Sequence, residues 1–305
     1  MVTLKHTFPE SFFEEEDRLG FHVDRKCKEI WAVELDLLYE LDRVCKKLEI
    51  PYYLDGGTLL GAARDGRFIP WDDDIDVAML REDYDRFLRE AGKEFDLPIF
   101  LQTGYSEKDY LHGHCQLRRG DTCAILPGEL GKVSFNQGIF LDIFVLDELF
   151  PEKVEQQYRC ARKLRRQRQK WNHHDFHPNP VRWAVRWSRY LLYKTRYRDS
   201  ASFYTELEAI FRSPERSEYL DYLMLNNGPE DVHRLKRTWY EETVQLPFEG
   251  RTFPAPKGYR QYLACYYGDD WRIPQNTASM HNLKGQVIFD TGRSYTEVLK
   301  DLLGQ

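Results

Sequence analysis

Residues 52–77 read YYLDGGTLLGAARDGRFIPWDDDIDV, and this stretch is the most informative part of the chain for both fold and function. The apolar residues 52–54 predict a short strand that runs into a Gly-Gly turn. Thr58 follows the turn and is a good N-cap, so we expect a short helix over 59–64. A second strand is predicted over 75–80. A strand, a glycine turn, a helix and a second strand, in this order, predict an α/β arrangement.

Acidic residues accompany this second strand. Side chains alternate between the two faces of a strand, so Asp74 and Asp76 project from the same face. Two adjacent carboxylates repel each other unless a cation neutralises them. A third acid, Asp142, lies in the apolar segment 139–144, where burial without a partner is costly. The sequence therefore predicts a three-carboxylate site for Mg²⁺ or Mn²⁺, both of which prefer oxygen ligands. In this site Asp142 is the third ligand or a base.

The Gly-Gly turn predicts an anion site beside these acids. Gly56, Gly57 and Thr58 lie where a helix begins, and the backbone N–H groups and the helix dipole at such a position favour phosphate. Arg64, about two turns along, adds a positive charge. Each feature alone also has a plain structural explanation, such as a solvated turn, a hairpin or a local cap. Together, their spacing matches the nucleotidyltransferase superfamily and predicts nucleotide phosphate chemistry.

Hydrophobic periodicity extends the prediction to the rest of the chain. We expect helices over 23–50, 81–95, 151–171, 181–198, 201–212, 215–226 and 294–303, and strands over 98–103, 112–118, 121–126 and 138–145. The fold class is therefore α/β (α+β), a nucleotidyltransferase-like mixed sheet with helices. We expect residues 1–150 to form the catalytic domain. Residues 151–305 would be a mostly helical half whose C-terminal segment completes the active site.

Composition narrows the class of protein. The chain has 305 residues, a formal net charge of −6 and 42% hydrophobic residues, which excludes a disordered or fibrous protein. No apolar run approaches the length of a membrane span. The six cysteines form no C-x-x-C pair, and the histidines of the segment 173–177 have no matching ligands nearby, so neither group predicts a metal site. The N-terminal segment lacks the pattern of a signal peptide, and we expect a cytoplasmic location.

Positive charge is concentrated in residues 159–198, which hold thirteen Lys or Arg and a single acid. Trp183, Trp187 and Tyr190 recur there at helical spacing. An aromatic face flanked by arginines suits peripheral contact with an anionic membrane at its inner face. The alternative is that this face packs on the catalytic half. Nucleic acid is not an expected partner, because the remainder of the chain carries a net charge of −18.

Three segments resemble the LicD family, which contains bacterial phosphocholine transferases and is related to the animal fukutin-related proteins. Residues 54–76, quoted above, closely resemble its signature. Residues 138–147 (GIFLDIFVLD) resemble its second block, with Val145 where a proline is usual. Tyr266-Tyr267-Gly268-Asp269-Asp270-Trp271, followed by Pro274 and His281, resembles its C-terminal motif. The resemblance is specific over 50–147 and 259–295 and weak across the basic helices.

The resemblance implies a magnesium-dependent phosphotransferase. Such an enzyme moves a phospho-alcohol group from a CDP-alcohol such as CDP-choline to a sugar hydroxyl of a cell-surface polysaccharide or a lipid-linked glycan, and it releases CMP. Arg118 lies where the family often has a basic residue, and with His281 and Lys284 it is expected to touch phosphate or base. Two alternatives stay open, a nucleotidyltransferase that uses an NTP and releases pyrophosphate, and a non-catalytic scaffold that docks at the membrane. The transferred alcohol, the acceptor sugar and the attacked phosphorus, α or β, are also open.

Overall fold

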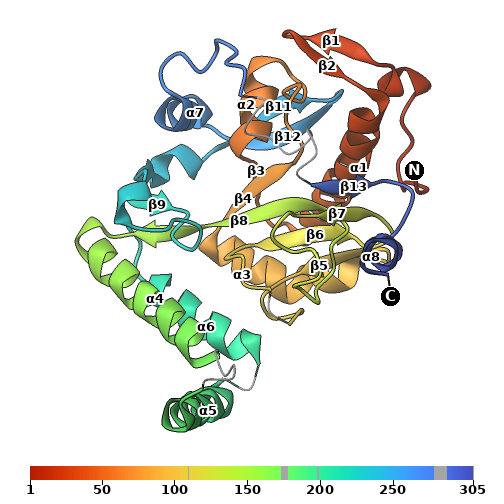
Figure 1. The fold of residues 1–305 in the computed structure, drawn as a ribbon. Coiled ribbons are helices and arrows are strands. Elements are labelled where there is room, and N and C mark those ends of the chain that lie inside the picture. Colours follow the sequence, from red (N-terminus) through yellow and green to blue (C-terminus); the bar gives the residue numbers. More distant parts are fainter. Residues whose placement is uncertain (109, 173–177, 198, 278–286, 305) are drawn as a thin grey trace.

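The computed structural model describes residues 1–304 apart from residue 109, residues 173–177, residue 198 and residues 278–286. Its centre is a mixed seven-stranded sheet in which β10, β9, β8, β4 and β3 follow one another, while β6 joins β8 to β5 (Figure 1). The strands of this sheet are β3 (Tyr53–Leu54), β4 (Asp76–Leu80), β5 (Ile99–Gln102), β6 (Cys115–Arg119), β8 (Ile139–Leu149), β9 (Tyr219–Asp221) and β10 (Leu235–Lys236). The expected mixed α/β class is confirmed.

Strand β8 organises this sheet. It pairs in parallel with β4 and antiparallel with β6, and its last residues pair antiparallel with β9. The register places Asp76, the first residue of β4, beside Asp142. Because neighbouring strands lie about 4.8 Å apart, this register alone brings two of the predicted acidic residues together.

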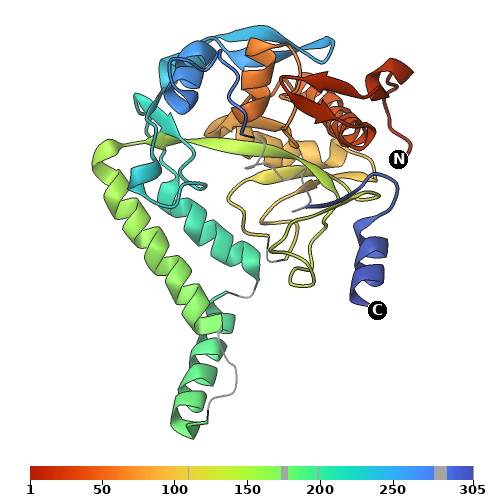
Figure 2. The same ribbon diagram turned by 45° about the horizontal axis from the view of Figure 1, so that its top comes forward.

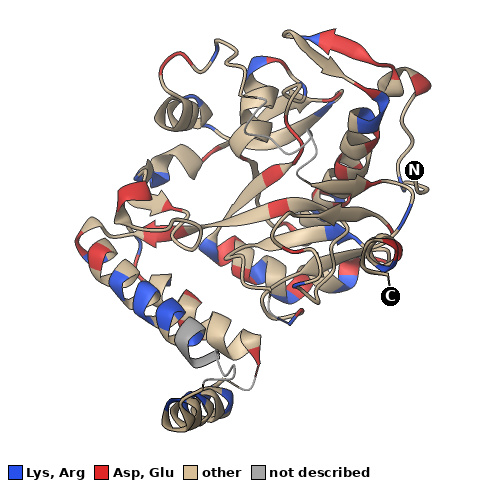
Figure 3. Cartoon of the chain, in the orientation of Figure 1, with Lys and Arg blue, Asp and Glu red and all other residues tan. Residues whose placement is uncertain are grey.

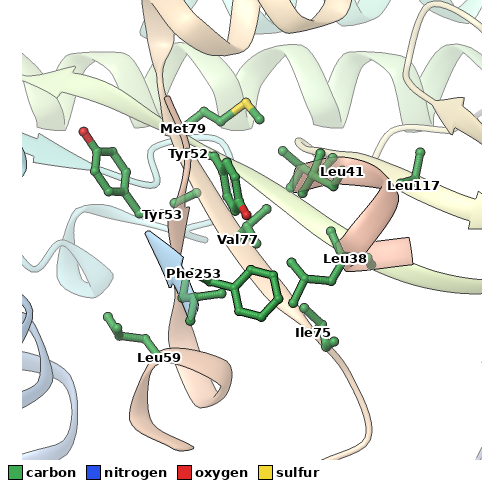
Figure 4. Close-up of a cluster of buried hydrophobic side chains, with 14 of the residues drawn as sticks. Leu38, Leu41, Tyr52, Tyr53, Leu59, Ile75, Val77, Met79, Leu117 and Phe253 are labelled. Carbon is green, nitrogen blue, oxygen red and sulfur yellow. The ribbon is translucent and has the colours of Figure 1, made fainter. Parts of the chain in front are cut away.

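Helix α1 (Arg25–Leu48) supplies much of the core. It begins after Asp24, whose side chain accepts a hydrogen bond from the Cys27 N–H. It ends before Glu49, whose backbone has the left-handed helical conformation. Leu38 and Leu41 of this helix pack with Val77 and Leu117 of the sheet in a single buried cluster (Figure 4). The long helix predicted over 23–50 is confirmed.

The remaining elements are mostly short. The helices are η1 (Glu10–Phe13), α2 (Gly56–Arg64), α3 (Arg81–Glu90), η2 (Ala91–Glu94), α4 (Pro151–Asn172), α5 (Pro180–Arg196), α6 (Ser200–Phe211), η3 (Pro229–Asp231), η4 (Arg237–Tyr240), α7 (Tyr259–Tyr267) and α8 (Tyr295–Leu303). Three two-stranded sheets complete the list: β1 (Glu16–Arg18) with β2 (Phe21–Val23), β7 (Cys123–Ile125) with β13 (Ile288–Asp290), and β11 (Thr243–Phe248) with β12 (Arg251–Pro256).

The second half of the chain contains more strand than the periodicity predicted. The helix expected over 215–226 is wrong, since β9 occupies part of it. The Asp221 side chain accepts hydrogen bonds from the backbone N–H groups of Tyr222, His233 and Arg234, and this stabilises a turn rather than a helix. The hairpin β11–β12 was not predicted, and it packs against α2 and β3. The main core cluster draws on both halves, from Val23 to Trp271, and the division at residue 150 stays a prediction.

Helices α4, α5 and α6 extend away from the sheet (Figure 2). A separate hydrophobic cluster holds α4 to α6, with Tyr158, Leu207 and Phe211 among its members. Helix α5 packs on α4 at the far end, and we call α4 and α5 together the arm. Among the described residues, no helix is both long and apolar enough to cross a membrane.

Candidate active site

Two overlapping groups of carboxylates lie at the start of β4. Asp74, Asp76 and Asp142 each offer an oxygen atom, and these atoms all lie within 4.8 Å of one another. Asp72, Asp73 and Asp74 form a second group under the same limit. Asp74 belongs to both groups, so the structure brings together the three acids predicted from the sequence and adds two neighbours. We call these five residues and Glu34, described below, the acid cluster.

The two glycines of the turn make room for this cluster. A Cβ atom on Gly56 would lie 2.7 Å from the Asp76 Oδ2 atom, and one on Gly57 would overlap the Asp72 carboxylate. Gly56 also has a φ of +50°, which few other residues adopt. The Gly-Gly pair is therefore required because two carboxylates pack directly against the first turn of α2.

Thr58 has a different role from the one expected. Helix α2 begins at Gly56, so Thr58 lies inside the helix and is not its N-cap. Its Oγ1 atom accepts a hydrogen bond of 2.9 Å from the backbone N–H of Asp76. The hydroxyl thus ties α2 to the first residue of β4 and fixes the backbone that carries one of the acids.

Burial and mutual repulsion raise the pKa of several of these acids. Burial raises the pKa of Asp76 well above its usual range, and the charges of Asp74 and Asp142 raise it further. Burial, with Asp74 and Asp73, does the same to the pKa of Asp72. A cation bound here would relieve both effects, because it favours the ionised carboxylates.

Glu34 of α1 is a further member that the sequence analysis missed. Its side chain is 1% exposed, and its Oε2 atom is buried without a hydrogen-bond partner among the described residues. Burial raises its pKa well above the usual range, and Asp74, Asp73, Asp72 and Asp142 add to the effect. The helical periodicity marked the apolar face of α1 but gave no sign that this face also carries an acid toward the cluster.

Asp142 is held by two residues of β6. His114 Nε2 lies 2.9 Å from Asp142 Oδ1, and Gln116 Nε2 donates a 2.6 Å hydrogen bond to the same atom. Burial acts to raise the pKa of Asp142, but His114 and Gln116 hold it below the usual value. This carboxylate therefore has one oriented oxygen and favours its ionised form.

Arg118, for which a contact with phosphate or base stays a prediction, lies inside the protein. It has no exposed surface, and its guanidinium donates hydrogen bonds to Gln102 Oε1, the Gly138 carbonyl and Gln116 Oε1. Arg118 lies on β6, which pairs with β5 on one side and β8 on the other. Arg118 therefore orients Gln116, which in turn contacts Asp142.

A pocket of about 290 Å³ opens beside the acid cluster. Four of its twelve lining residues are aromatic, and the full lining is Gly57, Leu60, Arg64, Ile69, Trp71, Asp72, Tyr266, Tyr267, Trp271, Ile273, Gln275 and Thr277. The Arg64 side chain is only 7% exposed, and its Nε donates to Asp65. Its Nη2 atom is buried without a hydrogen-bond partner among the described residues. A buried cationic donor in a pocket wall is suited to an anion.

The C-terminal half contributes to the same region through tyrosines. Tyr222 donates a 2.7 Å hydrogen bond to Asp55 Oδ1, and Tyr262 lies 3.3 Å from the backbone nitrogen of Gly56. Burial raises the pKa of Asp55, while hydrogen bonds from Tyr262 and Tyr222 act in the opposite direction. These contacts span about 170 to 200 residues of sequence, and no local pattern could have predicted them. His281 and Lys284 lie outside the described residues.

The donor set fits a hard divalent cation. The ligand atoms are carboxylate oxygens, gathered close enough to share an ion, and one further carboxylate oxygen has no partner among the described residues. Beside it lie a fixed cation in Arg64 and an aromatic pocket. Such a site can bind a metal ion together with a phosphate ester that carries a flat or apolar group.

Comparison with known proteins identifies relatives of this site. Residues 49–180 match the family described as LicD/FKTN/FKRP, nucleotidyltransferase domain. The lipopolysaccharide cholinephosphotransferase LicD of Haemophilus influenzae is 27% identical over 268 residues, which are 81% of this chain and 92% of that protein. The human ribitol 5-phosphate transferase FKRP is 35% identical over 77 residues, 21% of this chain and 16% of FKRP. The resemblance drawn from the sequence is thereby confirmed: residues 49–180 match the LicD family model.

Proposed function

We propose that this protein is a phosphotransferase that moves a phospho-alcohol group from a CDP-alcohol to a sugar hydroxyl and releases CMP. The acceptor would be a cell-surface polysaccharide or a glycolipid precursor, and the metal ion Mg²⁺ or Mn²⁺. One observation carries the proposal: an acid cluster that fits a divalent cation directly adjoins a pocket with a buried arginine nitrogen that has no hydrogen-bond partner among the described residues. The named activities of the relatives, a cholinephosphotransferase and a ribitol 5-phosphate transferase, support the same reaction class.

Asp74, Asp76 and Asp142 would hold the metal ion, which when bound neutralises charge on the diphosphate. Phosphoryl transfer needs mainly positioning and charge stabilisation, so the protein supplies fixed groups rather than covalent chemistry. Arg64 Nη2 would donate to a phosphate oxygen from the pocket wall. The amide groups in the first turn of α2, at Gly56, Gly57 and Thr58, add the positive end of the helix dipole.

The remaining residues would position these groups. His114 and Gln116 both contact Asp142 Oδ1, which leaves Oδ2 of the same carboxylate for the metal ion or for the proton of the acceptor hydroxyl. Trp71, Tyr267 and Trp271 give the pocket flat apolar surfaces that suit a nucleoside base. His281 and Lys284 stay predictions as further phosphate or base contacts.

The decisive experiment measures thermal unfolding with Mg²⁺ and a panel of nucleotides: CDP-choline, CDP-ethanolamine, CDP-ribitol, CTP, ATP and GTP. A ligand at about 100 times its Kd stabilises the folded state by roughly 2.7 kcal/mol, which raises Tm by a few degrees. We expect one CDP-alcohol to act, only with metal and not in the Asp74→Asn variant. Asp96→Asn is the matched control, since that side chain is 89% exposed.

The other outcomes distinguish the alternatives. Stabilisation by NTPs alone, with pyrophosphate as the product, would replace the proposal with a nucleotidyltransferase. No response to any nucleotide or metal would favour a non-catalytic scaffold. An equal response in the Asp74→Asn variant would contradict the metal site, whichever nucleotide is bound.

A further inference from the structure

Helix α5 presents its apolar side to solvent. Val181, Val185, Leu191 and Leu192 are 70%, 40%, 57% and 60% exposed, and Trp183 and Trp187 are 41% and 38% exposed. The α5 residues that are not exposed are Arg186, Arg189, Tyr190 and Tyr193. The structure therefore does not have the alternative arrangement, in which this aromatic face packs on the catalytic half.

This arrangement is the reverse of an ordinary amphipathic helix. Residues 181, 185, 188, 192 and 195 recur at helical spacing and form an exposed stripe of Val, Val, Ser, Leu and Thr. A second stripe, of residues 182, 186, 189, 193 and 196, holds Arg, Arg, Arg, Tyr and Arg, and its middle residues 186, 189 and 193 are the less exposed ones. On this helix Arg186 and Arg189 are partly buried, while valine and leucine side chains are exposed and have no apolar cover among the described residues.

The two hydroxyl groups on the exposed stripe do not require water. Ser188 Oγ donates to the Val185 carbonyl at 3.0 Å, and Thr195 Oγ1 donates to the Leu192 carbonyl at 2.8 Å. Burial of a hydroxyl is costly only when its hydrogen bond is lost. The whole stripe can therefore enter an apolar medium with its donors already satisfied.

The charge of the arm indicates which apolar medium this stripe meets. Helix α5 contains five Lys or Arg and no acid. On α4, Arg159, Arg162, Lys163 and Arg166 line a groove with a single acid, Glu155. Figure 3 shows the run of basic residues along this helix. A second copy of this chain would bring two sets of cations together across the contact. An anionic lipid surface accepts the apolar stripe and attracts the cations at its edges.

We propose that the arm is a membrane-docking element, in which α5 lies flat in the interface of an anionic bilayer with Val181, Val185, Leu191 and Leu192 inserted. With 17 residues, α5 is about 26 Å long, and its five cations exclude a spanning position. The arm would thereby hold the chain beside acceptors that are themselves anchored in the membrane. The contact itself is independent of the proposed reaction and can be measured without turnover.

The test is co-sedimentation of the full chain with phosphatidylcholine vesicles, with and without phosphatidylglycerol. We expect binding to the anionic vesicles alone, and weaker binding as salt is added. Leu191→Gln with Leu192→Gln should lower the partition coefficient at least about tenfold, because two leucines no longer insert. Leu302→Gln with Leu303→Gln is the matched control, since these leucines of α8 are 51% and 43% exposed.

Circular dichroism of both double variants checks that the fold is retained. Equal binding to the two vesicle types, or an equal loss in both double variants, would overturn the proposal. A third outcome would also overturn it: the chain does not bind vesicles, forms a dimer in sedimentation velocity, and loses that dimer in the Leu191/Leu192 variant. The exposed stripe would then bind a second copy of this chain. Turnover of a water-soluble acceptor, unchanged in the Leu191/Leu192 variant, keeps this test separate from that of the proposed function.

Discussion

The acid cluster and the arm depart from ordinary protein packing in opposite directions. At the start of β4 and β8, charged groups are buried close together, and Glu34 Oε2 and Arg64 Nη2 lack partners among the described residues. On α5, valine and leucine side chains are exposed while Arg186 and Arg189 are partly buried. Each arrangement costs free energy in the isolated chain. Each becomes favourable with a binding partner, a cation and phosphate in one region and an apolar anionic surface in the other.

The acid cluster and the arm also differ in how firmly the rest of the structure fixes them. The acid cluster is fixed by the sheet register, by α1 and by the Gly-Gly turn, so its geometry exists before any ligand arrives. The arm is held through the smaller cluster that joins α4 to α6, and α5 contacts α4 at the far end. Catalysis needs preorganised groups, whereas contact with a fluid surface does not.

The largest effect is expected from Asp74→Asn or Asp76→Asn. Loss of residues that support a metal ligand typically costs 10- to 100-fold, so loss of a ligand should reduce CMP release by at least about 100-fold. Tm without metal should stay the same or rise, because one repelling charge is gone. Asp96→Asn is the control, and turnover retained in both variants would contradict the assignment of the acid cluster as a metal site.

Substitution of two tryptophans, one beside the acid cluster and one on the arm, compares how much each region contributes to stability. Trp31 is fully buried, its ring stacks on that of Phe68 with 4.5 Å between the centroids, and its Nε1 donates a 2.9 Å hydrogen bond to the Asp72 carbonyl. Because these contacts would be lost, Trp31→Ala should lower the free energy of unfolding by about 3–5 kcal/mol. Trp187→Ala on the arm should change it by less than about 0.5 kcal/mol. Urea unfolding measures both. Similar losses would mean that the arm is part of the structural core.

Arg64→Gln tests whether the pocket beside the acid cluster binds phosphate. A hydrogen bond to a charged group is worth about 1.5–3 kcal/mol, so the KM for the CDP-alcohol should rise roughly 10- to 100-fold. Arg67→Gln provides the matched control, since that side chain is 50% exposed and lies 3.7 Å from Glu16. If the two variants bind the donor equally well, the pocket is not the phosphate site.

The smallest effect is on the pH dependence of stability. The pKa values of Glu34, Asp72 and Asp76 are raised in the folded state. Their contribution to the free energy of unfolding is therefore complete below the pKa of the unfolded state and is lost as pH rises through the pKa of the folded state. Without metal, Tm should therefore fall by a few degrees as pH rises above the ordinary range of carboxyl pKa values, about 4. Asp142 and Glu208, whose pKa is lowered, lose their contribution only in more acidic solution.

The Glu34→Gln variant isolates one group in this measurement. We expect a shallower decline of Tm with pH, because the substitution removes one of the three titrating carboxylates. Added Mg²⁺ should flatten the slope of the original chain in the same way. A Tm that rises across this pH range would contradict the repulsion among these acids.

Local patterns in the sequence were enough for the elements near the acid cluster. Spacing along the chain predicted the strand before the Gly-Gly turn, the strand that follows Asp74, the apolar strand around Asp142 and the long helix α1. These predictions succeeded because side-chain alternation and helical periodicity are local properties. The same reasoning failed for residues 215–226, where Asp221 accepts backbone hydrogen bonds from a segment that comes later in the chain.

The sequence by itself therefore determined which acids, glycines and cations the chain carries and the family model that residues 49–180 match. Only the tertiary structure decided that β4 and β8 pair with Asp76 beside Asp142, that Glu34 faces the same cluster and that Arg118 points inward to Gln116. It also decided that the apolar stripe of α5 faces outward. The physical reason is that register, burial and partner choice depend on contacts between residues far apart in the chain, and a local pattern carries no record of them.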